Sequence, residues 1–261
     1  MDHSQPGAGT AAPDTTASAA PGYPPAAVEW AVGRRPVRIL ELVAGEGALT
    51  VALAALGHDV LATDPSEQLV SRLAKRLRTA RTAVARAEDI PLPPAAVDVV
   101  VAGPLFASLD AARTLPEIAR VLRPGGSLSL IWSRGDTKIP WVRKMFALTG
   151  TTSTAVAPGP VESSELFAVT EHRMFRQWQR FERQTLVDFV ASSEKAAGLP
   201  PDERARLLAE AGELYDGYGR GPDGLLMPWL VECYRARVKG ATAPLPAVAA
   251  PVDDGLLIDF S

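Results

Sequence analysis

The chain has 261 residues, of which 47% are hydrophobic and 22% are charged, proportions that are ordinary for a globular protein. Its net charge of −3 and the scattered positions of its basic residues give no electrostatic footprint for nucleic acid or for an anionic membrane. One cysteine excludes an internal disulfide, and three histidines provide no metal-ligand spacing. The sequence therefore predicts a cytoplasmic protein with no nucleic-acid, membrane or metal partner, and it leaves the oligomeric state open.

The two ends of the chain differ in composition from the middle. Residues 1–22 offer almost nothing to bury and lack the basic and apolar regions of a secretory signal. Residues 240–261 return to Ala and Pro before closing on GLLIDFS, an apolar cluster to which the sequence assigns no role. Nowhere do about 18 apolar residues run without interruption, so no membrane span is predicted. We expect both ends to be mostly disordered, and residues 23–239 to form one domain in which 133–228 contribute substrate cover.

The clearest structural signal lies in residues 37–65. An apolar strand from Ile39 to Val43 leads into a turn of small residues that holds Gly45 and Gly47. A helix follows at once, and a second strand ends on Asp64. This order predicts the nucleotide-binding half of a Rossmann-like βαβ unit.

The predicted elements alternate along the rest of the chain. Helices are expected over residues 26–32, 47–56, 65–77, 114–122, 140–148, 185–192 and 202–215. Strands are expected over residues 39–43, 58–63, 82–87, 97–102, 127–132, 172–181 and 230–238. Pro116 interrupts one helical pattern, and Thr114 with Glu117 forms a capping-box sequence, so we expect that helix to begin at Thr114. The alternation predicts an α/β fold with a doubly wound, mostly parallel sheet and helices on both faces.

The glycine turn is more informative than its glycines alone. A dinucleotide motif G-x-G-x-x-G that starts at Gly45 would end on Thr50, whereas E-x-G-x-G-x-G fits better, with Glu41 first and Gly47 last. Here the chain resembles the class I S-adenosylmethionine-dependent methyltransferases, close to the methyltransferase type 11 group. Five further segments carry the resemblance, and their order and spacing together are specific: YPP (23–25), DPS (64–66), AEDIP (87–91), EIARVLRPGG (117–126) and PWV (140–142).

The resemblance implies S-adenosyl-L-methionine as cofactor and a set of residues that bind it. These cofactor-binding residues are Glu41, Val43, Gly45, Gly47, Asp64, Ala87, Glu88 and Gly103. In this assignment Glu41 supplies negative charge near the ammonium group, and an ionised Asp64 has enough acceptors for both ribose hydroxyls. The backbone at Ala87 and the carboxylate of Glu88 meet the adenine, with Ile90 as an apolar wall.

Each of these residues also has a purely structural interpretation. Glycines at a strand-to-helix turn are often present for geometry alone. Asp64 is a suitable helix N-cap with Glu67 three residues later, and Glu88 by itself fits a solvated loop carboxylate. The cofactor interpretation is favoured by the order in which the segments occur along the chain.

No residue is assigned a catalytic role by the sequence. Methyl transfer is an in-line displacement that positioning accelerates, so a general base is optional. His172 is more typical of a surface histidine than of a base. Side chains that are candidates for an acceptor pocket, with a core position as the alternative, are Phe106, Trp132, Ser133 and Trp141.

Departures from the family pattern keep other functions open. Val43 stands where the first glycine of the motif is expected, and Pro104, Ala107 and Ser108 replace a Gln and a His-Trp pair that relatives often carry. The leading hypothesis is methyl transfer from S-adenosylmethionine to a small-molecule acceptor, because a basic face and a separate recognition domain are lacking. The alternatives are a methyltransferase-fold binding protein with weak or no activity, and an NAD-dependent oxidoreductase, which Thr50 and Glu41 disfavour.

Overall fold

The computed structural model describes residues 21–151, 158–219 and 224–239, which form two compact units. The larger unit contains Pro21–Lys138 and the described parts of Ser153–Gln179 and Met227–Ser261. The smaller unit contains Ile139–Thr152, as far as it is described, and the described parts of Arg180–Leu226. The tails predicted at 1–22 and 240–261 lie outside the described residues, apart from Pro21 and Gly22.

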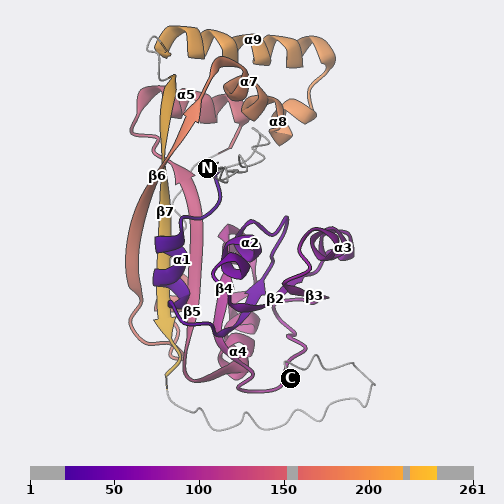
Figure 1. Ribbon diagram of the computed structural model, residues 1–261, viewed down its shortest axis with the longest axis vertical. Coiled ribbons are helices and arrows are strands. Elements are labelled where there is room, and N and C mark those ends of the chain that lie inside the picture. Colours follow the sequence, from indigo (N-terminus) through magenta and orange to yellow (C-terminus); the bar gives the residue numbers. More distant parts are fainter. Residues whose placement is uncertain (1–20, 152–157, 220–223, 240–261) are drawn as a thin grey trace, which may run out of the picture. The chain divides into compact units, whose positions relative to one another are not determined.

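Seven strands pair in the order β3-β2-β1-β4-β5-β7-β6 (Figure 1). Their bounds are Arg38–Leu42 (β1), Asp59–Asp64 (β2), Arg81–Val84 (β3), Val97–Ala102 (β4), Leu122–Gly135 (β5), Glu171–Phe181 (β6) and Leu225–Arg237 (β7). The first five strands pair in parallel, and β7 runs antiparallel to β5. The predicted doubly wound, mostly parallel sheet is thereby confirmed.

The helices divide between the two units. In the larger unit they are α1 (Pro25–Val32), α2 (Ala48–Ala55), α3 (Glu67–Arg76), the 3-10 helix η1 (Pro104–Ser108), α4 (Ala111–Val121) and α6 (Gly159–Glu162). In the smaller unit they are α5 (Pro140–Thr149), α7 (Arg183–Ala191), α8 (Glu194–Ala197) and α9 (Pro201–Tyr218). Among the described residues, no helix is both long enough and apolar enough to cross a membrane.

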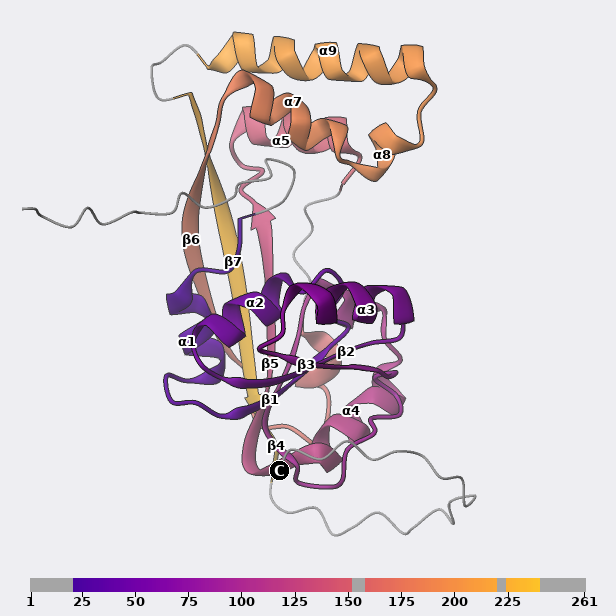
Figure 2. The same cartoon turned by 45° about the vertical axis from the view of Figure 1, so that its right-hand side comes forward.

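The core of the larger unit has two parts, one on each face of the sheet. Helices α1 and α2 bury Val28 and Leu53 on one face, and α4 buries Ile118 on the other (Figure 2). The central strand β4 supplies both parts, with Val100 on the α4 face and Val101 on the opposite face. A parallel strand covered on both faces is expected to be apolar throughout, which explains the run of β-branched residues.

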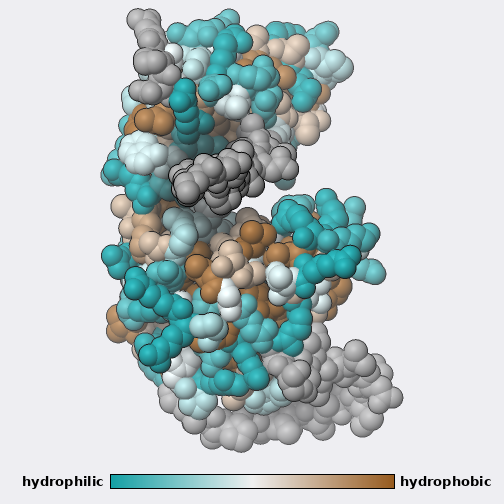
Figure 3. Space-filling model, viewed as in Figure 1, coloured by the Kyte–Doolittle hydropathy of each residue, from teal (hydrophilic) through white to brown (hydrophobic). Residues whose placement is uncertain are grey.

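Helix α3 lies at the surface of the larger unit. Its only buried residue is Leu73, and hydrophilic residues cover its outward side (Figure 3). It begins after Ser66, whose hydroxyl accepts a hydrogen bond from the N–H of Leu69 at 3.4 Å. The alternative prediction that Asp64 caps this helix is therefore wrong, and the carboxylate of Asp64 has a different role.

The predicted start of α4 was also wrong. The helix begins at Ala111, after Asp110, whose carboxylate accepts a hydrogen bond from the N–H of Ala112 at 3.0 Å. Pro116 lies inside the helix, where it removes one backbone hydrogen bond. Burial of Ile118 and its neighbours against the sheet outweighs that loss, because packing of an apolar face contributes more to a helix than local propensity.

The smaller unit is held together by aromatic side chains. Phe181 contacts Phe189 and Trp141 edge to face, with ring centroids 5.5 Å and 6.5 Å away. Arg183 at the start of α7 forms an ion pair with Asp216 of α9 at 3.0 Å.

Helices α6 and α8, each of four residues, were not predicted because so short a segment has no periodicity to detect.

Candidate functional site

The site residues predicted from the glycine motif gather at one edge of the sheet. Strand β1 lies between β2 and β4, and its last residue, Leu42, is level with Thr63 on β2 and Ala102 on β4. The residues that follow or end these strands, including Asp64 and Gly103, therefore share the carboxyl edge. In open α/β sheets this edge, next to the point where the strand order reverses, is where ligands bind.

The turn after β1 has a backbone conformation that favours glycine. Gly45 and Gly47 have φ angles of 56° and 75°, in the left-handed region that glycine adopts without strain. A Cβ atom at Gly47 would clash with Leu73 of α3, whereas one at Gly45 would have no heavy atom of the described residues within 4 Å, its chain neighbours aside. Packing therefore explains Gly47, and Gly45 leaves open space beside the turn.

Val43 takes the same left-handed conformation, with a φ angle of 54°. A β-branched residue in this region is strained, at a cost of about 1–3 kcal/mol. This is the position where the family motif has its first glycine. The turn thus has the left-handed backbone that a glycine would adopt, but valine occupies the position and is strained there.

Asp64 connects the turns that follow two neighbouring strands. Its side chain is buried, and its two oxygens accept hydrogen bonds from the N–H of Gly45 at 3.0 Å and the N–H of Ser66 at 2.9 Å. A carboxylate has about four lone-pair directions, so two remain for other donors. The arrangement suits a pair of ribose hydroxyls, and that role of Asp64 stays a prediction.

Glu41 is the most unusual ionisable group at this edge. It is 2% exposed, and its Oε2 has no hydrogen-bond partner among the described residues. Desolvation by burial raises the pKa of Glu41 to about 8, although Thr50 of α2 lowers it in part. A buried carboxyl group with an unused oxygen fits a ligand cation, so the residues present suit the ammonium group of S-adenosylmethionine.

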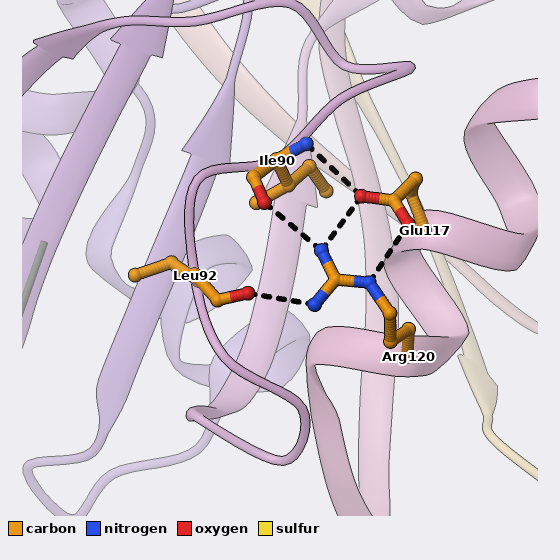
Figure 4. Close-up of polar contacts among 4 residues, drawn as sticks. All are labelled: Ile90, Leu92, Glu117 and Arg120. Carbon is orange, nitrogen blue, oxygen red and sulfur yellow. Dashed lines mark hydrogen bonds and ion pairs between the residues drawn. The ribbon is translucent and has the colours of Figure 1, made fainter. Parts of the chain in front are cut away.

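Two side chains of α4 hold the loop after β3 in place (Figure 4). Glu117 accepts a hydrogen bond from the N–H of Ile90 at 3.0 Å, and Arg120 donates to the carbonyl oxygens of Ile90 and Leu92 at 2.9 Å and 2.7 Å. Arg120 also pairs with Glu117 at 2.7 Å. We call these four residues the loop clamp. It holds in place the segment that contains Ala87, which is predicted to meet adenine.

Within that loop the structure separates the predicted residues by burial. Ala87 and Ile90 are 4% and 3% exposed and belong to the core on the α4 face. The side chain of Glu88 is 10% exposed and forms an ion pair with Arg86 at 3.4 Å. The interpretation of Glu88 as a solvated loop carboxylate is therefore wrong, because its side chain is largely covered and paired.

Gly103 follows the last residue of β4 at the carboxyl edge of the sheet and precedes η1. Apart from its chain neighbours, the nearest described atom to a Cβ at Gly103 would be the carbonyl oxygen of Ile131 at 4.0 Å, so packing does not require glycine there. Of the side chains considered for an acceptor pocket, Phe106 and Trp132 are buried in the core of the α4 face, and Trp141 belongs to the smaller unit. These three aromatic residues therefore take the core positions that were the alternative.

A polar cluster at β5, β6 and β7 had no signal in the sequence. Glu232 is 4% exposed and binds Arg134 at 2.7 Å through one oxygen and Nε2 of His172 at 2.6 Å through the other. The ring of His172 stacks on Tyr234, which in turn stacks on Trp132, with centroids 4.4 Å and 5.3 Å apart. These residues lie far apart in the chain and come together only when β5, β7 and β6 pair as neighbours in the sheet.

Within the described part of the chain, no group of three or more His, Cys, Asp or Glu side chains is arranged to hold a metal ion.

Comparison with known proteins agrees with this geometry. The family described as "Methyltransferase domain" matches residues 40–130. An uncharacterized methyltransferase of Mycobacterium tuberculosis (strain ATCC 25618 / H37Rv) is 33% identical over 219 residues, which cover 83% of this chain and 89% of the relative. A second protein, from strain CDC 1551 / Oshkosh and named as an S-adenosylmethionine-dependent methyltransferase, is 37% identical over 91 residues, 34% of this chain and 33% of its own.

A solved structure shares the fold. It is a candidate type II methyltransferase from Anaeromyxobacter dehalogenans, with a TM-score of 0.65 and 24% sequence identity, and the match covers 85% of this chain and 98% of that one. The sheet order, the left-handed turn after β1 and the extent of the sequence similarity lead to one conclusion. This chain belongs to the methyltransferase family, as an enzyme of the class I, Rossmann-like type.

Proposed function

We propose that this protein binds S-adenosylmethionine at the carboxyl edge of β1, β2 and β4 and transfers its methyl group to a small-molecule acceptor. The observation that carries the proposal is the buried, unpaired carboxyl group of Glu41 beside an open left-handed turn. Burying an unpaired carboxyl group lowers the stability of the free protein, and a bound ligand cation would supply the partner that Glu41 lacks. The mycobacterial relative whose name includes S-adenosylmethionine supports the same cofactor.

The chain's own residues bind and orient in this proposal. The N–H groups at the start of α2, which no side chain caps, face the carboxylate of the cofactor, as helix N-termini commonly do with anions. Asp64 holds the ribose, and the loop clamp keeps Ala87 beside the adenine. When bound, S-adenosylmethionine supplies a methyl group on a sulfonium sulfur, to be displaced by a nucleophilic atom of the acceptor. Positioning of the two reactants is then the main contribution of the protein.

A small acceptor is proposed from the charge and composition of the chain. With 27 basic and 30 acidic residues, the protein carries a net charge of −3, and such a balance does not attract a polyanion. A nucleic-acid methyltransferase would need an electrostatic footprint, and a small-molecule enzyme does not.

Methyl-labelled S-adenosylmethionine provides the test. The protein is incubated with it and with a small-molecule extract of the source cells, and the label is then followed into small molecules, protein and nucleic acid. We expect label in the small-molecule fraction, and none with Asp64→Asn. Label only in protein or nucleic acid would contradict the proposed acceptor class. Cofactor binding without any transfer would favour a methyltransferase-fold protein that binds its ligand without activity.

A further inference from the structure

Among the described residues, no charged side chain interacts with Glu41 to balance an ionised carboxylate. Thr50 lies beside it on α2, Tyr23 approaches from the segment before α1, and Cys233 of β7 lies close to Tyr23. All three are uncharged side chains at neutral pH, and burial raises the pKa of both Tyr23 and Cys233. Within the described residues Glu41 forms no ion pair. An isolated, fully buried carboxylate is strongly disfavoured in such a setting.

The hydrogen bonds around Glu41 lead to the same conclusion. Its Oε2 receives no donor, and the hydroxyl of Thr50 also has no partner in hydrogen-bond geometry among the described residues. Tyr23 directs its own hydroxyl to the backbone carbonyl of Ile131 at 3.5 Å. The hydroxyl and the backbone N–H of Thr50 lower the pKa of Glu41 only in part, and burial outweighs them, so the neutral acid is the favoured form in the free protein.

We propose that Glu41 carries a proton in the free protein and releases it when the ammonium group of the cofactor binds, so that cofactor binding is coupled to proton release. This inference rests on the proposed function, because it requires S-adenosylmethionine or its product to occupy the site. The proton balance is simple: the neutral carboxyl loses one proton to solvent, and the resulting carboxylate faces the ammonium.

The size of the coupling follows from the acid strength of Glu41. With a pKa of about 8, about nine-tenths of the molecules carry this proton at neutral pH, so binding there releases close to one proton per ligand. The dissociation constant should fall about tenfold for each unit of pH between about 5.5 and 7.5, and then level off. Ordinary carboxylate sites, ionised throughout this range, show no such dependence.

Calorimetric titration with S-adenosylhomocysteine measures the released proton directly. The product keeps the ammonium group and avoids turnover. At neutral pH the apparent binding heat should differ between phosphate and Tris buffers in proportion to their ionisation heats, with a slope near one proton released. Methylthioadenosine, which has the adenosine part without the amino acid, should bind with no buffer dependence.

Two variants separate Glu41 from other groups. Glu41→Gln should bind S-adenosylhomocysteine more weakly and without proton release, since an amide has no proton to lose in this range. His58→Gln is the matched control, because His58 is also buried and also titrates, but it precedes β2 at the opposite edge of the sheet. We expect His58→Gln to keep the full proton release.

The outcomes distinguish this inference from the proposed function. If S-adenosylhomocysteine binds to the wild-type protein with the same heat in both buffers and with an affinity independent of pH, the proton coupling is contradicted while the cofactor assignment stands. If it fails to bind at every pH, the proposed function itself fails. If Glu41→Gln no longer binds measurably, the buffer dependence of the wild-type protein and of His58→Gln still decides.

Discussion

Asp64, the last residue of β2, accepts a hydrogen bond at 3.0 Å from the backbone N–H of Gly45 in the turn after β1. Its second oxygen accepts from the N–H of Ser66, which caps α3. One buried carboxylate therefore sets the relative positions of the turns after β1 and β2, at the edge where the cofactor is proposed to lie. Its role in binding and its role in local structure are combined in the same side chain.

Replacing Asp64 should affect binding more than folding. We expect Asp64→Ala to abolish measurable S-adenosylhomocysteine binding and to lower the free energy of unfolding by about 1–3 kcal/mol, because two partly buried N–H groups lose their acceptor. In Asp64→Asn the amide oxygen keeps one of the two N–H acceptors, so this variant should also lose binding but with a smaller loss of stability. Calorimetry and chemical denaturation together give both values. Unchanged affinity in Asp64→Ala would leave this residue with a structural role only.

Val43→Gly should strengthen binding. Glycine adopts a φ of 54° without strain and lets a ligand approach the backbone, so the affinity for S-adenosylhomocysteine should rise by about ten- to a hundredfold. Ala95→Gly is the matched control, because Ala95 has a φ of 55° in the turn before β4. That variant should relieve backbone strain and leave the affinity as it was. An affinity that falls or stays constant in Val43→Gly would refute this account of Val43.

The burial of Glu41 also predicts how stability depends on pH. Its pKa is raised from 4.5 to about 8 on folding, so the folded chain binds more protons between these values than the unfolded chain. This contribution is complete below about pH 4.5, is lost as the pH rises, and is absent above about pH 8. Across this pH range the contribution of Glu41 to the free energy of unfolding changes by a total on the order of 5 kcal/mol. Denaturation of wild type and Glu41→Gln across this range should show a difference that changes with pH, and a constant difference would contradict it.

Breaking the loop clamp should weaken adenine binding from a distance. Arg120→Ala removes the donor to Ile90 and Leu92, so the loop after β3 loses its fixed position, and the affinity for S-adenosylhomocysteine should drop about tenfold. Arg34→Ala is the matched control, since Arg34 is 85% exposed and pairs with Glu29 at the surface. Equal affinities for the two variants would show that the clamp does not support the site.

The clamp has its own dependence on pH. Burial alone would raise the pKa of Glu117, but hydrogen bonds from Arg120 and Ile90 outweigh burial and hold that pKa below its usual value. A carboxyl group of this kind stabilises the fold above its unfolded pKa, and the contribution is lost as the pH falls through the folded value. The stability difference between wild type and Arg120→Ala should therefore be largest near neutral pH and shrink on acidification, as denaturation curves can show.

Much of the fold could be predicted because the signals are local. The strand before Gly45, the apolar run that became β4 and the strand that begins near His172 are each visible as short periodic or continuous apolar segments. The motif order also located the residues that meet at the carboxyl edge of the sheet. The ends of such strands can be predicted because turn-forming residues follow the apolar segment directly in the sequence.

The remaining features depend on residues that are distant in the chain. The start of α4 was missed because packing on the sheet outweighs the effect of Pro116. The cluster of Glu232 with Arg134 and His172 exists only after β5, β6 and β7 assemble, and the burial of Glu41 depends on covering segments that no local pattern specifies. Burial and ionisation are properties of the assembled core, so the sequence named Glu41 but gave no sign of its unusual acid strength.

We propose the edge formed by β1, β2 and β4 as the site for S-adenosylmethionine. Calorimetric titration of the wild-type protein with S-adenosylhomocysteine and, separately, with NAD tests it most directly. We predict saturable binding of one S-adenosylhomocysteine per chain and no heat of binding with NAD. Binding of NAD without binding of S-adenosylhomocysteine would contradict the account.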